Sequence, residues 1–116
     1  MGVSIYYSFS SKKDLIELGA LDELSDQWNA EFASDLSEES RSEPWTWYEP
    51  KHENGENLYE GATKISMDVL QGGNCVIQAV KLLSALRNTH GGDGWSVNLD
   101  DFEIPWDEEE KSFILA

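Results

Sequence analysis

Two segments of the chain combine clustered carboxylates with aromatic side chains. One spans residues 43–60 and the other spans residues 100–110. Tryptophan and tyrosine are favoured anchors at protein interfaces, and carboxylates around them would steer a basic partner. We expect such a partner to contact Asp100, Asp101, Glu103, Trp106, Asp107, Glu108, Trp45, Trp47 and Glu49. The alternative is that the aromatic side chains face the core and the acids face water, which strand alternation predicts equally well.

Cys75 is the only cysteine of the chain and its main candidate nucleophile. It falls in the first turn of a predicted helix, where the helix dipole can lower a thiol pKa. A small buried apolar residue is the favoured interpretation. His90 cannot serve as its general base in an intact helix, because fifteen residues of helix separate the two by about 22 Å. An enzyme that uses Cys75 or a pair of carboxylates is therefore an alternative, and we expect a protein that is not an enzyme.

Sites for metals, phosphates and cofactors are not indicated. Zinc usually takes paired Cys or His at short spacing, whereas the chain has one Cys and two distant His. Carboxylates between residues 100 and 108 could hold a calcium ion weakly, but a solvated acidic rim is the favoured interpretation. Gly72-Gly73-Asn74 precedes a predicted helix but lacks the lysine of a phosphate-binding loop. We expect neither a metal nor a cofactor.

The net charge of −15 narrows the classes of partner. Binding to nucleic acid or to an anionic membrane needs clustered Lys and Arg, so this chain is expected to avoid both. The charge is also uneven, since residues 31–60 and 100–116 carry −13 of the total while residues 61–99 carry +1. We therefore expect a basic protein partner, with the protein itself a monomer or a weak dimer.

The length of 116 residues fits one domain that spans residues 1–116. The sequence has no apolar run long enough for a transmembrane helix. Its N-terminus lacks the basic leader and long apolar core of a signal peptide, and we interpret it as a first strand. A single cysteine favours a reducing, cytoplasmic setting.

Periodic patterns predict the elements that position the acidic segments. The stretch from Val3 to Phe9 is typical of a strand. Ser11 and Asp14 resemble a capping box ahead of a helix whose stripe contains a possible break at Gly19. The apolar residues of that stripe are Leu15, Leu18, Leu21, Leu24 and Trp28.

The middle of the chain predicts a hairpin and a second helix. A strand around Trp45–Tyr48 ends at Pro50, Asn54-Gly55 makes the turn, and the return strand runs from Leu58 to Ile65 with a bulge at Gly61. Asn74 is expected to cap the second helix, and Gly91 is expected to end it.

The last part of the chain alternates in two phases. One phase runs over Trp95, Val97 and Leu99, and the other over Phe102, Ile104 and Trp106. The change falls at Asp100-Asp101 and predicts a bulge or corner there. The order βαββαβ with a possible C-terminal hairpin predicts an α+β ferredoxin-like sandwich, in which two helices cover one face of a mainly antiparallel sheet.

A family of short, acidic bacterial proteins resembles this chain in three segments: Tyr6-Tyr7-Ser8, Glu60-Gly61-Ala62-Thr63-Lys64 and Asp100-Asp101-Phe102-Glu103-Ile104-Pro105-Trp106-Asp107-Glu108. The resemblance spans most of the chain and implies a bacterial origin, but it brings no activity, cofactor or catalytic residue. The composition is also similar to that of immunity proteins and other nuclease inhibitors, without a shared motif.

The leading hypothesis is a small acidic protein that neutralises a basic partner, as an immunity protein or toxin inhibitor would. Two acidic and aromatic segments without a catalytic constellation motivate it. The first alternative is a structural or regulatory ferredoxin-like module that self-associates, and the second is the enzyme described above.

Overall fold

A computed structural model describes residues 2–31, 44–66 and 72–114 of the chain. Its architecture is α+β, with two helices and a mainly antiparallel sheet among the described residues. In chain order the elements are β1 (Gly2–Ser11), α1 (Ala20–Glu31), β2 (Lys51–Glu53), β3 (Glu56–Ser66), α2 (Gly72–His90), β4 (Asp93–Leu99), β5 (Phe102–Glu103), β6 (Trp106–Asp107) and β7 (Ser112–Phe113).

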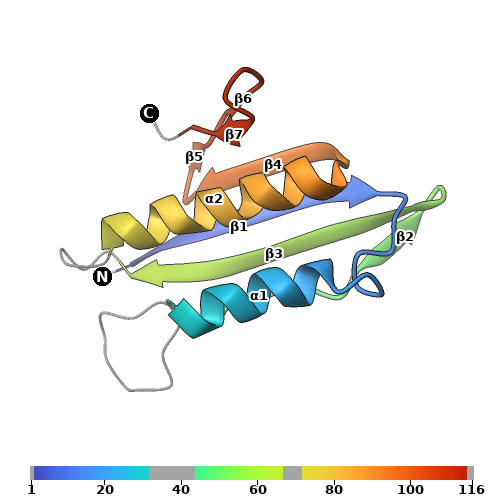
Figure 1. Cartoon of the computed structure of the whole chain (residues 1–116), viewed down its shortest axis with the longest axis horizontal. Coiled ribbons are helices and arrows are strands. Elements are labelled where there is room, and N and C mark those ends of the chain that lie inside the picture. The colour runs from blue at the N-terminus through green and yellow to red at the C-terminus, as the bar shows by residue number, and fades with distance from the viewer. Residues whose placement is uncertain (1, 32–43, 67–71, 115–116) are drawn as a thin grey trace.

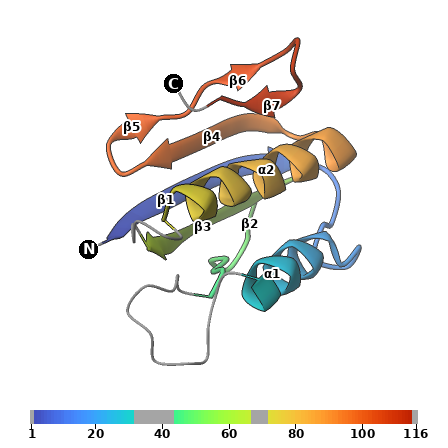
Figure 2. The ribbon, with the colours of Figure 1, turned by 60° about the vertical axis from the view of Figure 1, so that its left-hand side comes forward.

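The main sheet has five strands in the order β2-β3-β1-β4-β5. β1 is central and pairs antiparallel with β3 on one side and with β4 on the other. Both helices lie against the same face of this sheet (Figure 1), and the view turned by 60° agrees (Figure 2). The strands β6 and β7 form a separate small hairpin beyond β4. No helix among the described residues covers the opposite face of the sheet, which we call the uncovered face.

The core lies between the helices and the sheet, and the pleat of β1 decides which side chains enter it. Ile5, Tyr7 and Phe9 are buried toward the helices, whereas Tyr6 is exposed and Ser8 is half-buried on the other face. This is the period-2 alternation of a strand with one buried face, and it confirms the strand predicted over Val3 to Phe9. Trp28 from α1 and Leu83 from α2 complete the centre of the core.

The first helix begins later than expected. Asp14 accepts a hydrogen bond from the Glu17 amide in a turn, and Gly19 then adopts a φ of +76°. A helix cannot continue through that left-handed residue, so α1 starts at Ala20 and the predicted break at Gly19 is confirmed. Leu18 consequently leaves the apolar stripe and is 61% exposed.

The central hairpin is confirmed, but two details of its prediction are wrong. Asn54 and Gly55 both have positive φ in the turn between β2 and β3, as a two-residue hairpin loop requires. β2 begins after Pro50, not at Trp45, although the Tyr48 amide bonds to Glu60 O and keeps the preceding segment beside β3. Gly61 makes no bulge, because the register between β1 and β3 continues through it.

The second helix begins at Gly72, so Asn74 lies inside α2 and does not precede it. Its end is as predicted, since Gly91 has a φ of +71° and its amide bonds to Arg87 O.

The break in alternation at Asp100-Asp101 is a tight reversal of the chain. β5 folds back antiparallel on β4, with Leu99 opposite Phe102. The chain therefore turns a corner at Asp100-Asp101, one of the two predicted outcomes, and does not form a bulge within one strand. The first phase of alternation belongs to β4, and the second begins in β5 and continues into β6. The expected C-terminal hairpin is present as β6 and β7.

Candidate functional site

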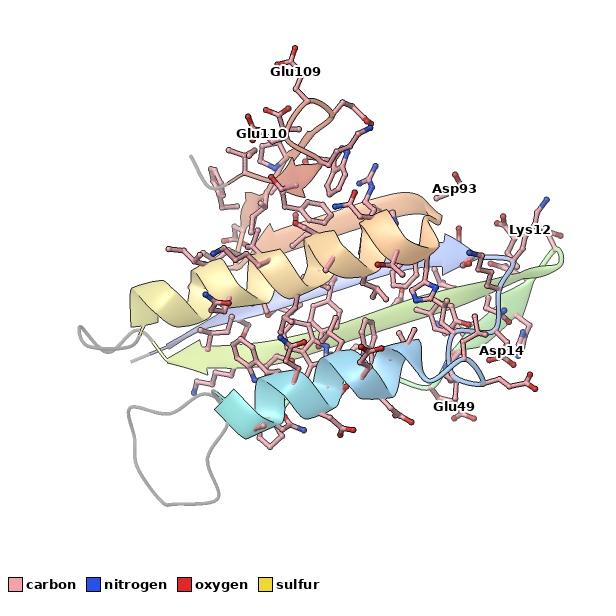
Figure 3. All side chains as sticks on the ribbon, viewed as in Figure 1. Lys12, Asp14, Glu49, Asp93, Glu109 and Glu110 are labelled. Carbon is pink, nitrogen blue, oxygen red and sulfur yellow. The ribbon has the colours of Figure 1, made fainter. Side chains whose placement is uncertain are left out.

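The two acidic segments lie on opposite sides of the molecule. β2, which follows Glu49, forms one edge of the five-stranded sheet, and β5 forms the other. Figure 3 shows Glu49 at the α1 side of the molecule, with Glu109 and Glu110 beyond β4 at the far side. The two segments therefore form two separate surfaces, and the predicted contact residues are not brought together into one.

The tryptophans of the first segment belong to the core. Trp45 is only 6% exposed and stacks on Tyr7 with ring centroids 4.7 Å apart. Trp47 is half-buried, packs edge-on against Tyr7, and donates its Nε1–H to Ser25 Oγ on α1 at 3.1 Å. Trp45 thus has no free surface for a partner, and of the three predicted contacts here Glu49 alone is exposed.

The hydroxyl of Tyr7 holds the backbone of the first acidic segment in place at Thr46. Its hydroxyl donates to Thr46 O and lies 2.7 Å from Thr63 Oγ1, which in turn accepts from the Thr46 amide. Burial raises the pKa of the Tyr7 phenol well above its usual range, and these hydrogen bonds offset the rise only in part. The phenol is therefore neutral and serves as a structural hydrogen-bond centre.

In the second segment, Asp100 has a structural role. It adopts a φ of +51° at the turn after β4, its carboxylate accepts from the Ser4 amide at 3.0 Å, and its own amide donates to Ser4 O at 2.8 Å. This pair of bonds closes the end of the β1–β4 ladder. The neighbouring Asp101 and Glu103 are exposed.

Asp107 shapes the turn of the C-terminal hairpin. One carboxylate oxygen accepts from the amides of Glu109 and Glu110, at 2.8 and 3.2 Å. Lys111 Nζ lies 3.6 Å from Glu108 Oε2, the only ion pair formed by the described residues. Because both partners of that pair are exposed, it neutralises the turn only weakly.

The hairpin is held against α2 and β4 by Arg87. Its guanidinium carbon lies 4.1 Å from the ring centre of Trp106, 5.6 Å from that of Phe113 and 5.8 Å from that of Trp95. The Phe113 amide donates to Ser84 Oγ, and Asn88 Nδ2 donates to Lys111 O. Trp106 is therefore half-buried against Arg87, and the hairpin that contains the acidic turn is fixed to α2.

Phe102 is the residue of this region that sequence reasoning missed. It alternates with Ile104 and was not among the predicted contacts; Ile104 is buried, whereas Phe102 is 53% exposed on the edge strand β5. The sequence signal that could have revealed this exposure is the position of Phe102 directly after the turn at Asp100-Asp101, where the strand has only begun. A large exposed aromatic flanked by Asp101 and Glu103 is typical of an interface anchor.

A shallow hollow of about 500 Å³ lies along the same hairpin. Trp106 and Ile114 give it apolar surface, and three carboxylates surround that surface. The complete lining is Pro105, Trp106, Asp107, Glu108, Glu109 and Ile114. We name the outer part of this region the acidic hairpin surface, which comprises the half-buried Asp107 and the exposed residues Asp101, Phe102, Glu103, Glu108, Glu109 and Glu110.

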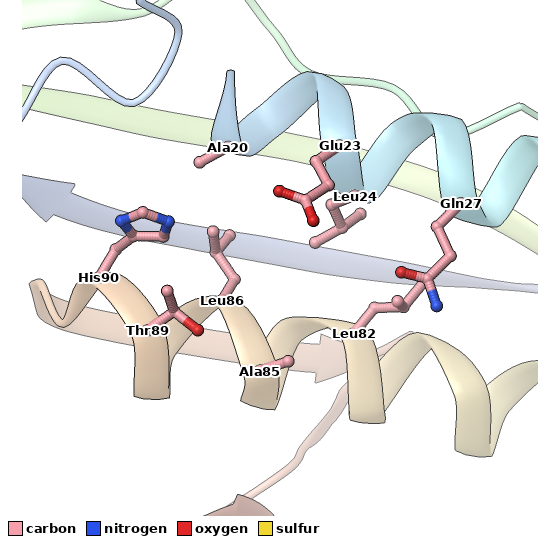
Figure 4. A pocket seen from close by; sticks show the side chains of 9 residues that line it. All are labelled: Ala20, Glu23, Leu24, Gln27, Leu82, Ala85, Leu86, Thr89 and His90. Atoms are coloured by element: carbon pink, nitrogen blue, oxygen red, sulfur yellow. The ribbon is translucent and has the colours of Figure 1, made fainter. Parts of the chain in front are cut away.

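A second cavity, of about 140 Å³, lies between α1 and α2 (Figure 4). Its floor is aliphatic, from Leu24, Leu82 and Leu86, and Glu23 and His90 lie at its margins.

Within residues 2–31, 44–66 and 72–114 no three His, Cys, Asp or Glu side chains gather as metal ligands would. No described helix is long and apolar enough to span a membrane. The side chain of Cys75 lies outside the described residues.

Searches for related proteins returned no matching family model, no similar curated protein and no similar solved structure.

Proposed function

We propose that this protein binds a basic protein partner through the acidic hairpin surface and masks the cationic surface of that partner, as an inhibitor or immunity protein in the bacterial cytoplasm would. Asp101, Glu103, Asp107 and Glu108, predicted from the sequence, are retained as contacts, and Phe102 is added to them. Trp45 is omitted because it is buried.

One observation carries the proposal: an exposed aromatic ring and an apolar hollow are both surrounded by carboxylates that outnumber the cations beside them. Residues 100–114 contain seven carboxylates and one lysine. Crowded like charges oppose the folded state, and a cationic partner relieves that repulsion. The aliphatic stem of a lysine or arginine would fit the hollow at Trp106, while its charged end would meet the rim formed by Asp107, Glu108 and Glu109.

Rigid support favours such binding. The ring contacts of Arg87, the hydrogen bond that Ser84 Oγ accepts and the one that Asn88 Nδ2 donates hold the hairpin before any partner arrives. A surface that is already ordered loses less conformational entropy on association. The remote position of Glu49 restricts the proposed contact to the second acidic segment.

The fold itself supports a finer proposal, a ferredoxin-like arrangement extended by β5 and the terminal hairpin. The order β4-β1-β3-β2, with each neighbouring pair antiparallel, is what two interleaved strand-helix-strand units produce. Self-association through the uncovered sheet face is less well supported, because Tyr6 there is surrounded by polar side chains such as Ser8, Glu60 and Asn98, and because the whole chain carries −15.

The test is capture of partners from a bacterial lysate on immobilised wild-type protein and on Phe102→Ser. Phe102 is exposed, so its replacement leaves the core intact. We expect a basic protein that the wild type retains at low salt, that elutes at high salt, and that Phe102→Ser retains poorly. Retention of the same proteins by both forms, or capture that salt does not affect, would refute the proposal.

A further inference from the structure

The uncovered face of the sheet contains a hollow of about 200 Å³ in which aromatic rings and one carboxylate meet. The side chains that define it are Tyr6, Ser8, Tyr48, Glu60, Ser96 and Asn98. It lies on β1, β3 and β4, on the face opposite the helices, and is separate from the acidic hairpin surface.

Strand register builds this hollow in two adjacent rows. Glu60, Ser8 and Ser96 are directly opposite one another across β3, β1 and β4, and they form the first row. Ala62, Tyr6 and Asn98 form the second row in the same way. Glu60 and Tyr6 are diagonal neighbours across β3 and β1, about 7–8 Å apart, a separation that long and aromatic side chains can bridge. The small side chain of Ala62 leaves space between them.

Tyr48 closes the hollow at the side of β3. Its amide donates to Glu60 O at 2.8 Å, which fixes its backbone beside that of Glu60. The rings of Tyr6 and Tyr48 are both about half exposed, an unusual position for large aromatic side chains on an otherwise polar sheet face.

The charge inside the hollow has one sign. Glu60 is the only charged residue that lines it, and the one ion pair among the described residues lies elsewhere, at Glu108. Lys64 is on the same face but stands opposite Ser4, one row beyond Ala62. An anion is therefore disfavoured here, whereas a cation would meet a carboxylate, two aromatic rings and the polar side chains of Ser8, Ser96 and Asn98.

We infer that this hollow binds the guanidinium group of an arginine side chain. A guanidinium is planar and weakly hydrated, so it can stack on a tyrosine ring while its N–H groups donate to a carboxylate and to neighbouring hydroxyl and amide oxygens. An ammonium group is more strongly hydrated and stacks less well. This site does not depend on the function proposed above, because it uses none of the residues of the acidic hairpin surface.

The probe is N-acetyl-arginine amide, titrated into isotopically labelled protein and followed by NMR. We expect the largest amide shifts at Tyr6, Ser8, Ser96 and Asn98, and none with N-acetyl-citrulline amide, which has nearly the same shape without the charge. The lysine analogue is expected to bind more weakly than the arginine one. Tighter binding of the lysine analogue, or equal shifts with citrulline, would overturn the assignment.

Substitutions locate the site. Glu60→Gln should weaken binding of N-acetyl-arginine amide about fivefold to tenfold, and Tyr48→Ser about twofold to fivefold. Glu53→Gln is the matched control, since it makes the same change in charge at an exposed position of β2 outside the hollow, and it should leave the affinity unchanged. Equal weakening by Glu60→Gln and Glu53→Gln would reduce the interaction to general charge attraction and overturn the inference.

Discussion

Tyr7 stands directly opposite Gly61 in the register of β1 and β3, and its ring occupies the space that a side chain on Gly61 would need. A β-carbon at this position would clash with Tyr7 Cε2 and with the backbone oxygen of Thr46. The absence of a side chain at Gly61 thus lets Tyr7 reach across β3 to Thr46 and Thr63, which ties the first acidic segment to the sheet.

Gly61→Ala should therefore lower the free energy of unfolding by about 3 kcal/mol, the upper part of the range for an overpacked core. Gly55→Ala is the control, because a β-carbon there meets nothing within 4 Å and suffers only from the φ of +81°, at a cost of about 1 kcal/mol. Urea unfolding followed by tryptophan fluorescence measures both. Equal losses in the two variants would contradict the close packing of Tyr7 on Gly61.

The raised pKa of Tyr7 makes stability depend on alkaline pH. The folded state keeps a phenol proton that the unfolded chain releases above its ordinary pKa of about 10. The stabilisation is therefore full below that pH and is lost as the pH rises further. Above about pH 10 the stability advantage of the wild type over Tyr7→Phe should fall by about 1.4 kcal/mol per pH unit. A difference that stays constant from about pH 8 to pH 11 would show that the phenol ionises normally.

Asp100 is expected to act through its bonds to Ser4 and its backbone conformation. Asp100→Asn keeps an acceptor oxygen and tolerates the φ of +51°, so its stability should stay within about 0.5 kcal/mol of the wild type. Asp100→Ala removes the acceptor and strains the turn, and it should lose about 1–2 kcal/mol. Chemical denaturation of the two variants decides the matter, and a large loss in Asp100→Asn would mean that the charge itself stabilises the turn.

Arg87 is expected to hold the C-terminal hairpin in place. Arg87→Met keeps the aliphatic stem but removes the cation from the rings of Trp106 and Phe113, at a cost of about 1 kcal/mol. Hydrogen exchange at the amides of Phe113 and Ile114 should accelerate about fivefold in consequence. Lys81→Met, an exposed cation on the same helix, serves as the control and should leave these rates unchanged.

Local patterns predicted most of the elements, because the determinants of those elements are local. The β-branched and aromatic residues from Val3 to Phe9 predicted β1, the pair Asn54-Gly55 predicted the hairpin turn, and Gly91 predicted the end of α2. The start of α1 depended on whether Gly19 bends the helix or ends it. A sequence pattern alone does not decide between these outcomes, because they differ in whether Gly19 adopts a left-handed φ, as it does in the structure.

The candidate site was harder to predict, since it depends on pairing between distant parts of the chain. Trp45 resembled an interface residue until β1 supplied Tyr7 as its stacking partner. Phe102 was not predicted as a contact, and the turn at Asp100-Asp101 places it exposed on the edge strand β5. Charge blocks in a sequence give no sign of their separation in space, which here follows from strand order.

The central claim is that a basic partner binds the acidic hairpin surface, and two charge-matched variants test it most directly. Glu108→Gln/Glu109→Gln/Glu110→Gln changes the hairpin, and Glu17→Gln/Glu53→Gln/Glu56→Gln makes the same change in net charge elsewhere. Titration calorimetry with the captured and purified partner should show that the hairpin variant loses at least about tenfold in affinity, or about 1.4 kcal/mol, while the control variant stays within about twofold of the wild type. Equal affinities for the two variants would contradict the account.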